Sequence, residues 1–300
     1  MSDAPDVAAR RYNAITVMSD LGTADGYVGV LHSIMRQLAP GVEIVDLTHD
    51  IPACDIQAGA LVLARSVQYL CPGVIIGAVD PGVGSGQRPV ALEVAGGAAV
   101  LVGPDNGVLA SAVGMISGAD RAFVLDNTDF HIGGGAATFA TRDIFAPVAA
   151  HLCAGATLED VGTEIDPNSL LPGLVPLNNV DVGEDGTPFV EAEVLWVDRF
   201  GNVQLNVDPD DIAGWPEAVQ LDASGVPRTL VRVATFSQLQ TSQIGLLVDS
   251  DGLLTVAMYA RSAAEELSLH RGDGIRISPL EDDTPRTSVS LGPTRRTGGE

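Results

Sequence analysis

Gly77-Ala-Val-Asp-Pro-Gly-Val-Gly-Ser-Gly-Gln-Arg88 is the stretch that decides the fold. The apolar run from Val74 to Val79 predicts a buried parallel strand, which ends abruptly at Asp80 in a loop of proline and glycines. Open α/β sheets bind their ligands at this carboxyl edge of the strands. The stretch therefore indicates an α/β sheet with Asp80 at its functional edge, and the alternative is an ordinary turn capped by Asp80.

The residues before this stretch repeat the same pattern. Ala14 to Met18 and Val42 to Leu47 are predicted strands, and Asp20 and Asp50 follow them. Parallel strands joined by right-handed crossovers have their carboxyl ends at one edge of the sheet, so Asp80 is expected to share that edge with both. For Asp50, an N-cap of the following helix is the favoured interpretation.

The rest of the chain predicts two domains of different fold class. Further helices are predicted over residues 25–38, 56–71, 108–116 and 139–154, and further strands over 89–94, 98–102 and 121–125. After a loose, proline-containing segment the hydrophobic period changes to two, with strands over 190–197, 203–207, 229–233, 245–248, 253–258 and 274–277. We therefore predict an N-terminal α/β sheet domain over residues 12–162 and a linker over 163–187. A smaller C-terminal β-barrel domain follows over 188–280, and a probable disordered tail over 281–300.

The charge of the chain excludes two classes of partner. The formal net charge is -23, and all 16 basic residues are arginine. Such a surface repels nucleic-acid phosphates and anionic headgroups, so no nucleic-acid and no membrane partner is expected. A lysine-poor genome or a saline habitat explains most of this bias, and attraction of a cationic substrate is the other explanation.

The cysteines and the N-terminus indicate a cytoplasmic protein. Cys54, Cys71 and Cys153 are odd in number and lack CxxC spacing, which argues against a disulfide framework or a zinc site and for a reducing compartment. No metal ligand is predicted. The first residues carry acids and no apolar core, and no apolar stretch is long enough to cross a membrane.

Short motifs in order along the chain resemble one family. They are Ser19-Asp-Leu-Gly-Thr-Ala-Asp25, Asp80-Pro-Gly-Val-Gly84, Pro104-Asp-Asn-Gly107, Thr138-Phe139 with Arg142-Asp-Ile-Phe145, and Asp198-Arg-Phe-Gly-Asn202. Together they resemble the S-adenosyl-L-methionine (SAM) hydroxide adenosyltransferases, or SAM hydrolases, which are related to the fluorinase and chlorinase. The match runs from about residue 13 to 280 and covers both predicted domains, so it is more specific than any one loop.

The resemblance implies a homotrimer with SAM bound between subunits and no separate cofactor. Asp80 would orient the attacking water, with Gln87 and Thr141 as weaker catalytic partners. The implied substrate-binding residues are Asp20, Asp25, Asn106, Asp198, Phe200, Asn202, Phe236, Ser250 and Ala260. Among these, Asp20 would hold the ribose, Asp25 and Asp198 the methionine end, and the two phenylalanines the adenine. The alternatives are a tight hairpin at 198–202 and a core position for Phe236.

The chain departs from the family pattern in informative places. The hydrolases carry an arginine where this chain has Gln87, followed by Arg88, and a His-Gly pair where it has Ala140-Thr141. The halogenases carry a tyrosine at the position of Asp80. The chain is thus an atypical, mixed member, and Tyr259 stands at the position of an adenine-pocket asparagine.

Three functions are compatible with these residues. The first is hydrolysis of SAM to adenosine and L-methionine by in-line attack of water or hydroxide at C5′. The second is SAM-dependent halide transfer, which an anionic Asp80 disfavours, because two unit charges about 4 Å apart repel by about 4 kcal/mol at an effective dielectric constant of about 20. That energy corresponds to about a thousandfold in halide occupancy. The third is a non-catalytic protein that binds an adenosyl ligand.

Overall fold

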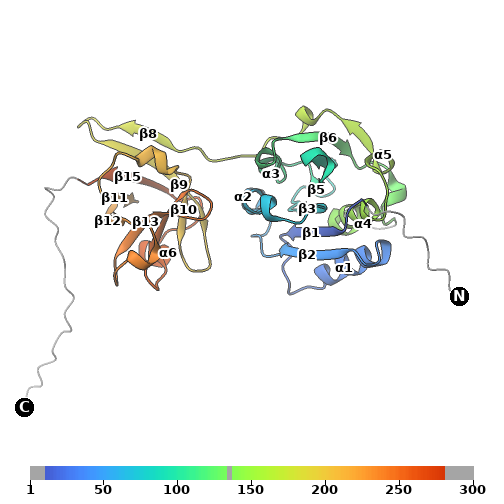
Figure 1. Ribbon diagram of the computed structural model, residues 1–300, viewed down its shortest axis with the longest axis horizontal. Coiled ribbons are helices and arrows are strands. Elements are labelled where there is room, and N and C mark those ends of the chain that lie inside the picture. The colour runs from blue at the N-terminus through green and yellow to red at the C-terminus, as the bar shows by residue number, and fades with distance from the viewer. Residues whose placement is uncertain (1–10, 134–136, 281–300) are drawn as a thin grey trace, which may run out of the picture. The chain divides into compact units, whose positions relative to one another are not determined.

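The computed structural model describes residues 11–133 and 137–280, and the chain divides into two compact units (Figure 1). The boundary between the units falls between Val175 and Pro176. The first unit is a mixed α/β sheet and the second is a β-barrel, which confirms the predicted fold class. The tail predicted over residues 281–300 lies outside the described residues.

The first unit is built on a seven-stranded sheet with the order β2-β1-β3-β5-β4-β6-β7. Its strands are β1 (Ala14–Ser19), β2 (Glu43–Thr48), β3 (Val74–Ala78), β4 (Pro89–Val94), β5 (Ala99–Pro104), β6 (Ala119–Val124) and β7 (Thr163–Ile165). The pairs among β2, β1, β3 and β5 are parallel, and those from β5 through β4 and β6 to β7 are antiparallel. All residues of β1 and β3 are buried, as expected for strands with helices on both faces.

Helices cover both faces of this sheet. The longer helices are α1 (Tyr27–Leu38), α2 (Ile56–Ser66), α3 (Ala110–Met115) and α4 (Ala146–Cys153). A short α-helix, α5 (Leu158–Val161), and a π-helical turn, η4 (Thr141–Phe145), are also present. The 3₁₀ turns of this unit are η1 (Val67–Tyr69), η2 (Ala95–Gly97), η3 (Thr128–Phe130) and η5 (Pro167–Ser169). Helix α1 packs beside α4 on one face, and α2 packs beside α3 on the other (Figure 1). The main core lies under α1 and α4, where Leu31, Met35 and Leu152 contact the sheet.

The strand order places a topological switch point between β1 and β3. The chain crosses from β1 to β2 on one side and then returns to β3 on the other side of β1. Crossovers that leave in opposite directions open a crevice outside the carboxyl ends of these two strands. Asp20 follows β1 and Asp80 follows β3, so both aspartates stand at this crevice.

The second unit is a barrel with one added strand. Its strands are β8 (Asn179–Val182), β9 (Pro188–Val197), β10 (Val203–Leu205), β11 (Ala218–Ala223), β12 (Val226–Arg232), β13 (Ile244–Val248), β14 (Leu254–Met258) and β15 (Gly274–Pro279), and its helical turns are η6 (Pro209–Ile212), η7 (Phe236–Gln238) and α6 (Ala263–Leu267). The ladder runs β10-β14-β13-β12-β11-β15-β9-β8, and a further β10–β9 pairing closes the barrel. Among the described strands of this unit, β12 and β13 form the only parallel pair.

Several local predictions differ from the structure. The segment 163–187, predicted as a linker, contains β7 at its start, paired with β6, and β8 near its end, paired with β9. Strands β7 and β8 are short and lie among prolines and acidic residues, so they give little of the period-two hydrophobic pattern that predicts a strand. The cap predicted at Asp50 is wrong, because α2 begins at Ile56 and Asp55 caps it by accepting a hydrogen bond from the Ala58 backbone N–H at 2.9 Å.

We expect Gly103→Ala to destabilise the first unit. A Cβ at Gly103 would lie 2.4 Å from the backbone oxygen of Gly77 in the adjacent strand, which cannot move aside without disturbing the sheet. The free energy of unfolding, measured by urea denaturation of the full chain, should fall by about 1–3 kcal/mol. The control is Gly114→Ala, because that Cβ on exposed α3 meets nothing within 4 Å and should be neutral or stabilising by up to about 1 kcal/mol. Equal stabilities for the two variants would contradict the packing at β3 and β5.

Candidate active site

A cavity of about 320 Å³ opens beside Asp80 in the first unit. One wall is the glycine-rich loop after β3, from Asp80 through Gly82 and Gln87 to Pro89. The other wall is formed by Ala137, Phe139, Ala140, Asp143, Ile144 and Phe145. Because the cavity lies at the carboxyl end of β3, it occupies the place where open α/β sheets bind ligands.

Asp80 and Gln87 form a hydrogen-bonded pair at this cavity. The Gln87 amide Nε2 donates to the Asp80 carboxylate Oδ1 at 2.9 Å, and both side chains line the cavity. The Asp80 carboxylate also accepts a hydrogen bond from the backbone of Gly82. Two donors therefore fix the direction of the carboxylate at the cavity wall.

Burial raises the pKa of Asp80 above its usual value, and this is the largest influence on it. The hydrogen bonds from Gln87 and Gly82 stabilise the anion and act in the opposite direction, whereas the negative charge of Asp20 raises the pKa further. A carboxylate whose proton affinity is increased in this way is a better base than one in free solution. Asp80 is thus the residue of this cavity best suited to accept a proton.

Gly82 and Gly84 of this loop are each needed for a different steric reason. A Cβ at Gly82 would lie 2.6 Å from Oε1 of Gln87, so glycine leaves the space through which the Gln87 side chain returns to Asp80. Gly84 has φ +80°, and a Cβ there would lie 2.6 Å from the backbone oxygen of Ala137. The loop packs against the other wall of the cavity at this point.

Asn106 and Arg88 hold the surrounding backbone. The Asn106 amide donates to the backbone oxygen of Val79 at 2.8 Å, directly before Asp80, and its oxygen accepts from the Val108 N–H at 3.1 Å. Arg88 lines the cavity, but its Nε donates to Asp105 at 2.9 Å and a second nitrogen donates to the backbone oxygen of Ser169 at 2.7 Å. The Arg88 guanidinium is therefore turned to Asp105 and Ser169.

The loop after β1 carries the two other predicted aspartates of this unit. The half-buried Asp20 accepts a hydrogen bond from the backbone N–H of Cys54 at 2.8 Å, which joins the loops after β1 and β2. Asp25 is exposed. Among the described residues these side chains do not line the cavity, although the charge of Asp20 reaches Asp80.

The π-helical turn η4 shapes the second wall. Thr141, at its start, is buried, and the cavity is lined by its neighbour Ala140. Sequence reasoning missed the site residues Phe139 and Asp143, although both lie in the Thr-Phe and Arg-Asp motifs that carried the resemblance. Asp143 is bound by the Nε of Arg142 at 2.6 Å, and the Phe139 ring lies edge to face with Tyr27, with ring centroids 5.2 Å apart.

Three of the predicted residues of the second unit, Asp198, Phe200 and Asn202, lie in one tight turn between β9 and β10. The Asp198 carboxylate accepts from the backbone N–H groups of Phe200 and Asn202 at 2.8 and 2.9 Å, and from the Asn202 amide at 2.7 Å. Gly201 has φ +80°, and its backbone oxygen accepts from the N–H of Ala264 in α6. The hairpin interpretation of this motif is thus correct as a description of its backbone.

Aromatic rings are nevertheless left at the surface of this unit. Phe200 is 73% exposed and Phe236 is 47% exposed, so the core alternative for Phe236 is wrong. Tyr259 is also exposed, at 54%. Ser250 in the β13–β14 turn and Ala260 after β14 are exposed as well. Exposed rings beside an ordered turn are suited to stacking on a planar ligand.

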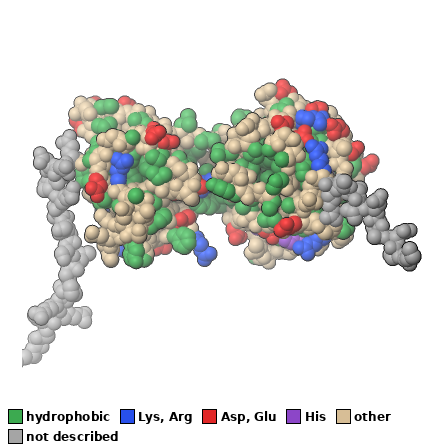
Figure 2. All heavy atoms as spheres, in the orientation of Figure 1, with side chains coloured by type: hydrophobic (Ala, Val, Ile, Leu, Met, Phe, Trp, Pro, Cys, Tyr) green, Lys and Arg blue, Asp and Glu red, His purple; other side chains and the backbone are tan. Residues whose placement is uncertain are grey.

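Three further features concern the surface, the helices and the cysteines. The face drawn in Figure 2 shows acidic and arginine side chains scattered among neutral and hydrophobic ones, without a continuous basic patch. Across the described ranges, no helix combines the length and the apolar character that a membrane crossing requires. Cys54, Cys71 and Cys153 all lie in the described part and form no disulfide there.

Sequence profiles of one family match most of the chain. The N-terminal domain of the SAM hydroxide adenosyltransferases matches residues 15–162, and the C-terminal domain of the same family matches residues 192–276. The two matches fall in the two units of the structure.

Individual proteins with similar sequences or folds agree with this match. The chain is 39% identical to an (R)-S-adenosyl-L-methionine hydrolase from Salinispora tropica, over 88% of this chain and 97% of that protein. It is 26% identical to a fluorinase from Actinoplanes sp., over 88% of this chain and 97% of that protein. An uncharacterized conserved protein from Thermotoga maritima has a similar crystal structure, with a TM-score of 0.76, 29% identity, and coverage of 88% of this chain and 99% of that one.

We expect Asp198→Ala and Phe200→Ala to affect stability very differently. The first removes the acceptor of three hydrogen bonds and should lower the free energy of unfolding by about 1–3 kcal/mol. The second truncates a ring that is 73% exposed and should change stability by no more than about 0.5 kcal/mol. Urea denaturation of both variants measures the difference. A destabilisation by Phe200→Ala as large as that expected for a buried aromatic would show that the ring is a packing residue.

Proposed function

Because the chain belongs to the SAM hydroxide adenosyltransferase family, we propose that it hydrolyses S-adenosyl-L-methionine to adenosine and L-methionine. The observation that carries the proposal is the Asp80–Gln87 pair, which lines a cavity at the carboxyl end of β3. The family match supplies the substrate, and this pair supplies a base held in a fixed direction.

The chemistry requires little from the protein beyond orientation and a base. The oxygen of water attacks C5′ of the ribose, the bond from C5′ to sulfur breaks, and its electron pair goes to sulfur. The sulfonium thereby leaves as the neutral thioether of methionine, so no acid is needed at the leaving atom. The Asp80 carboxylate accepts the proton of the water, and the cavity walls hold the water in line and exclude bulk solvent.

Gln87 keeps a donor at the position where the family has an arginine. Its neutral amide stabilises the Asp80 anion by one hydrogen bond, whereas a guanidinium would add a full positive charge. Asp80 therefore stays more basic here than beside an arginine. Thr141 is the weakest of the three proposed catalytic residues, because it is buried and its neighbour Ala140, rather than Thr141 itself, lines the cavity.

The remaining assignments rest on the resemblance. Asp20 would bind the ribose hydroxyls, with Asn106 nearby, and Asp25 and Asp198 would lie near the methionine end. The exposed rings of Phe200 and Phe236 would stack on the adenine, with Asn202, Ser250 and Ala260 beside it. We propose a cytoplasmic homotrimer, with each substrate bound between subunits.

Incubation with SAM followed by chromatography tests the reaction directly. Because the Salinispora protein is named for the (R) epimer at sulfur, the two sulfonium epimers should be supplied separately. We expect adenosine and methionine in equal amounts. A 5′-halo-5′-deoxyadenosine formed only with added halide would instead support halide transfer, and stoichiometric binding with neither product would support a binding protein.

Asp80→Asn should abolish most turnover without weakening the fold. The change preserves size and removes the base, so the rate of adenosine formation should fall by about 10²–10⁴ while substrate affinity changes little. The pKa of Asp80 is raised in the folded state, so ionisation of this residue costs stability as the pH rises from its usual pKa through the raised one. Asparagine avoids that cost, and the free energy of unfolding at pH 7 should be unchanged or higher.

The contrasting variant is Asp20→Asn, which should weaken binding as well as turnover because a charge-assisted contact to the ribose is lost. Equilibrium affinity for SAM and the rate of adenosine formation are measured for both variants. Unchanged hydrolysis in Asp80→Asn would show that this carboxylate is only structural.

The pH dependence tests the role of Gln87. If the Asp80 anion is the base, kcat/KM falls at low pH with an apparent pKa above the usual value for aspartate, which is about 3.9. Gln87→Leu removes a donor that stabilises the anion, so this acid limb should move to higher pH. Gln37→Leu, on the exposed side of α1, is the control and should leave the profile in place. An acid limb unmoved by Gln87→Leu would contradict the assignment.

A further inference from the structure

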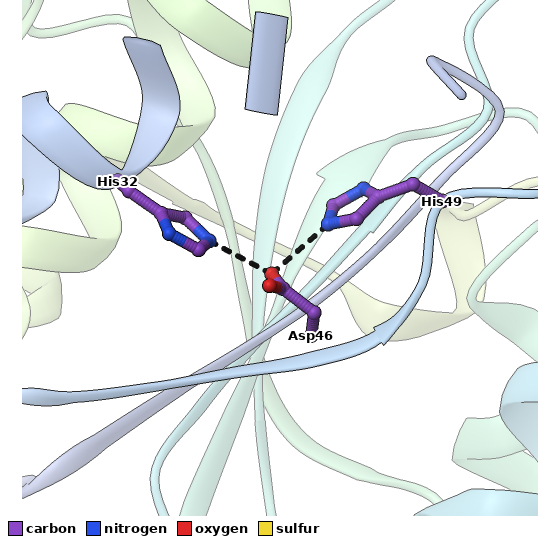
Figure 3. A group of neighbouring side chains, drawn as sticks. All are labelled: His32, Asp46 and His49. Carbon is purple, nitrogen blue, oxygen red and sulfur yellow. Dashed lines mark hydrogen bonds and ion pairs between the residues drawn. The ribbon is translucent and has the colours of Figure 1, made fainter. Parts of the chain in front are cut away.

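A group of two histidines and one aspartate lies apart from the cavity in the first unit (Figure 3). His32 projects from α1, Asp46 from β2, and His49 from the segment directly after β2. The Nε2 atoms of His32 and His49 lie 2.8 and 2.9 Å from the same carboxylate oxygen, Oδ1 of Asp46. One ligand atom from each residue lies within 4.8 Å of the other two.

We propose that His32, Asp46 and His49 form a binding site for a divalent transition-metal ion. Two imidazoles and one carboxylate suit zinc and the neighbouring divalent metals, and they leave further positions open for water. Metal–ligand bonds of about 2.1 Å place ligand atoms about 3.4 Å apart in a tetrahedral site and about 3.0 Å apart at the right angles of an octahedral site. The two nitrogen–oxygen separations, 2.8 and 2.9 Å, are close to the octahedral value, and a tetrahedral ion would need the ligands to move apart by about 0.5 Å.

The surroundings of His49 have the form expected around a metal ligand. Its second ring nitrogen, Nδ1, lies 2.7 Å from Oγ of Ser19, and Ser19 is fully buried at the end of β1. A hydrogen bond from the far side of the ring fixes its orientation and leaves Nε2 to coordinate the ion. His49 itself is only 4% exposed, so its ring is held on every side.

The other two ligands give the ion a route to the site. The side chains of His32 and Asp46 are 27% and 39% exposed, so a hydrated ion can reach the carboxylate from solvent and exchange water for imidazole. The cysteine pattern of the sequence could not indicate this site, because it uses no thiolate. The ligands are also drawn from a helix, a strand and a loop that only folding brings together.

The alternative is a network of hydrogen bonds with no ion. In that network each Nε2 carries a proton and donates it to Oδ1 of Asp46, and Nδ1 of His49 accepts from the Ser19 hydroxyl. In the metal site both Nε2 lone pairs face the ion, and Nδ1 of His49 donates to Ser19. The two arrangements differ in the direction of the His49–Ser19 hydrogen bond, and the hydrogen bonds from both Nε2 atoms to Asp46 exist only in the network without an ion.

A metal at this site would fasten the loop that carries Asp20. The His49 backbone oxygen accepts from the Gly22 N–H at 2.8 Å, and Ser19 directly precedes Asp20. Fixing His49 therefore fixes both sides of the Asp20 position. The metal proposal does not rest on the proposed hydrolysis, since binding is measured without any substrate.

Metal binding to the chelator-treated full chain tests the proposal, with Co²⁺ and Zn²⁺ as the probes. Visible absorption of Co²⁺ reports its coordination, and titration calorimetry gives the affinity and stoichiometry of Zn²⁺. We expect one ion per chain and a rise in melting temperature when it binds. His32→Gln retains an amide donor for Asp46 and removes the imidazole, and it should lower the affinity by more than about 100-fold.

The control variant is His270→Gln, an exposed histidine of the second unit, which should bind as the unchanged chain does. His32 is chosen over His49 because His49 is buried and its replacement can prevent folding. The melting temperature of the metal-free His32→Gln chain, compared with that of the metal-free parent, shows whether the variant is folded. Absence of stoichiometric binding by the parent chain, or equal affinity in His32→Gln, would overturn the proposal.

Discussion

The parallel pairing of β1 with β3 is the constraint on which the first unit depends. Both strands are entirely buried and run in the same direction, so the loops that follow them must leave the sheet at the same edge. Two carboxylates, Asp20 and Asp80, are thereby brought within electrostatic reach of each other. Burial and the negative charge of Asp20 disfavour ionisation of Asp80, and the hydrogen bonds from Gln87 and Gly82 act in the opposite direction. The strand order thus determines that the two carboxylates of the site lie near each other.

The sequence predicted those parts of the fold whose signals are local. Continuous apolar runs identified β1 and β3, and the strands predicted over 89–94 and 98–102 correspond to the antiparallel strands β4 and β5. The change of the hydrophobic period to two after the first unit correctly predicted a β-barrel. The family resemblance implied Gln87 as a weaker partner of Asp80, but no local signal of the sequence predicted the hydrogen bond between their side chains.

Features that depend on distant partners could not be predicted in this way. Strand β11 was missed because its residues, Ala218–Ala223, include polar side chains whose burial is set by β12 and β15. The orientation of Arg88 was likewise open, since Asp105 and Ser169 reach it only in the folded chain. The trio around Asp46 has no sequence spacing that marks it, because one ligand comes from a separate helix.

The long strand β9 also determines when the second unit can finish folding. It pairs with β10, which follows it directly, and with β15, which is the last strand within residues 137–280. The barrel therefore cannot close until β15 has left the ribosome, whereas every strand of the first unit has been made by Ile165. During synthesis the first unit can form while the barrel strands still expose apolar side chains such as Val194 and Ile277. Strand β15 is thus the element that completes the second hydrophobic core.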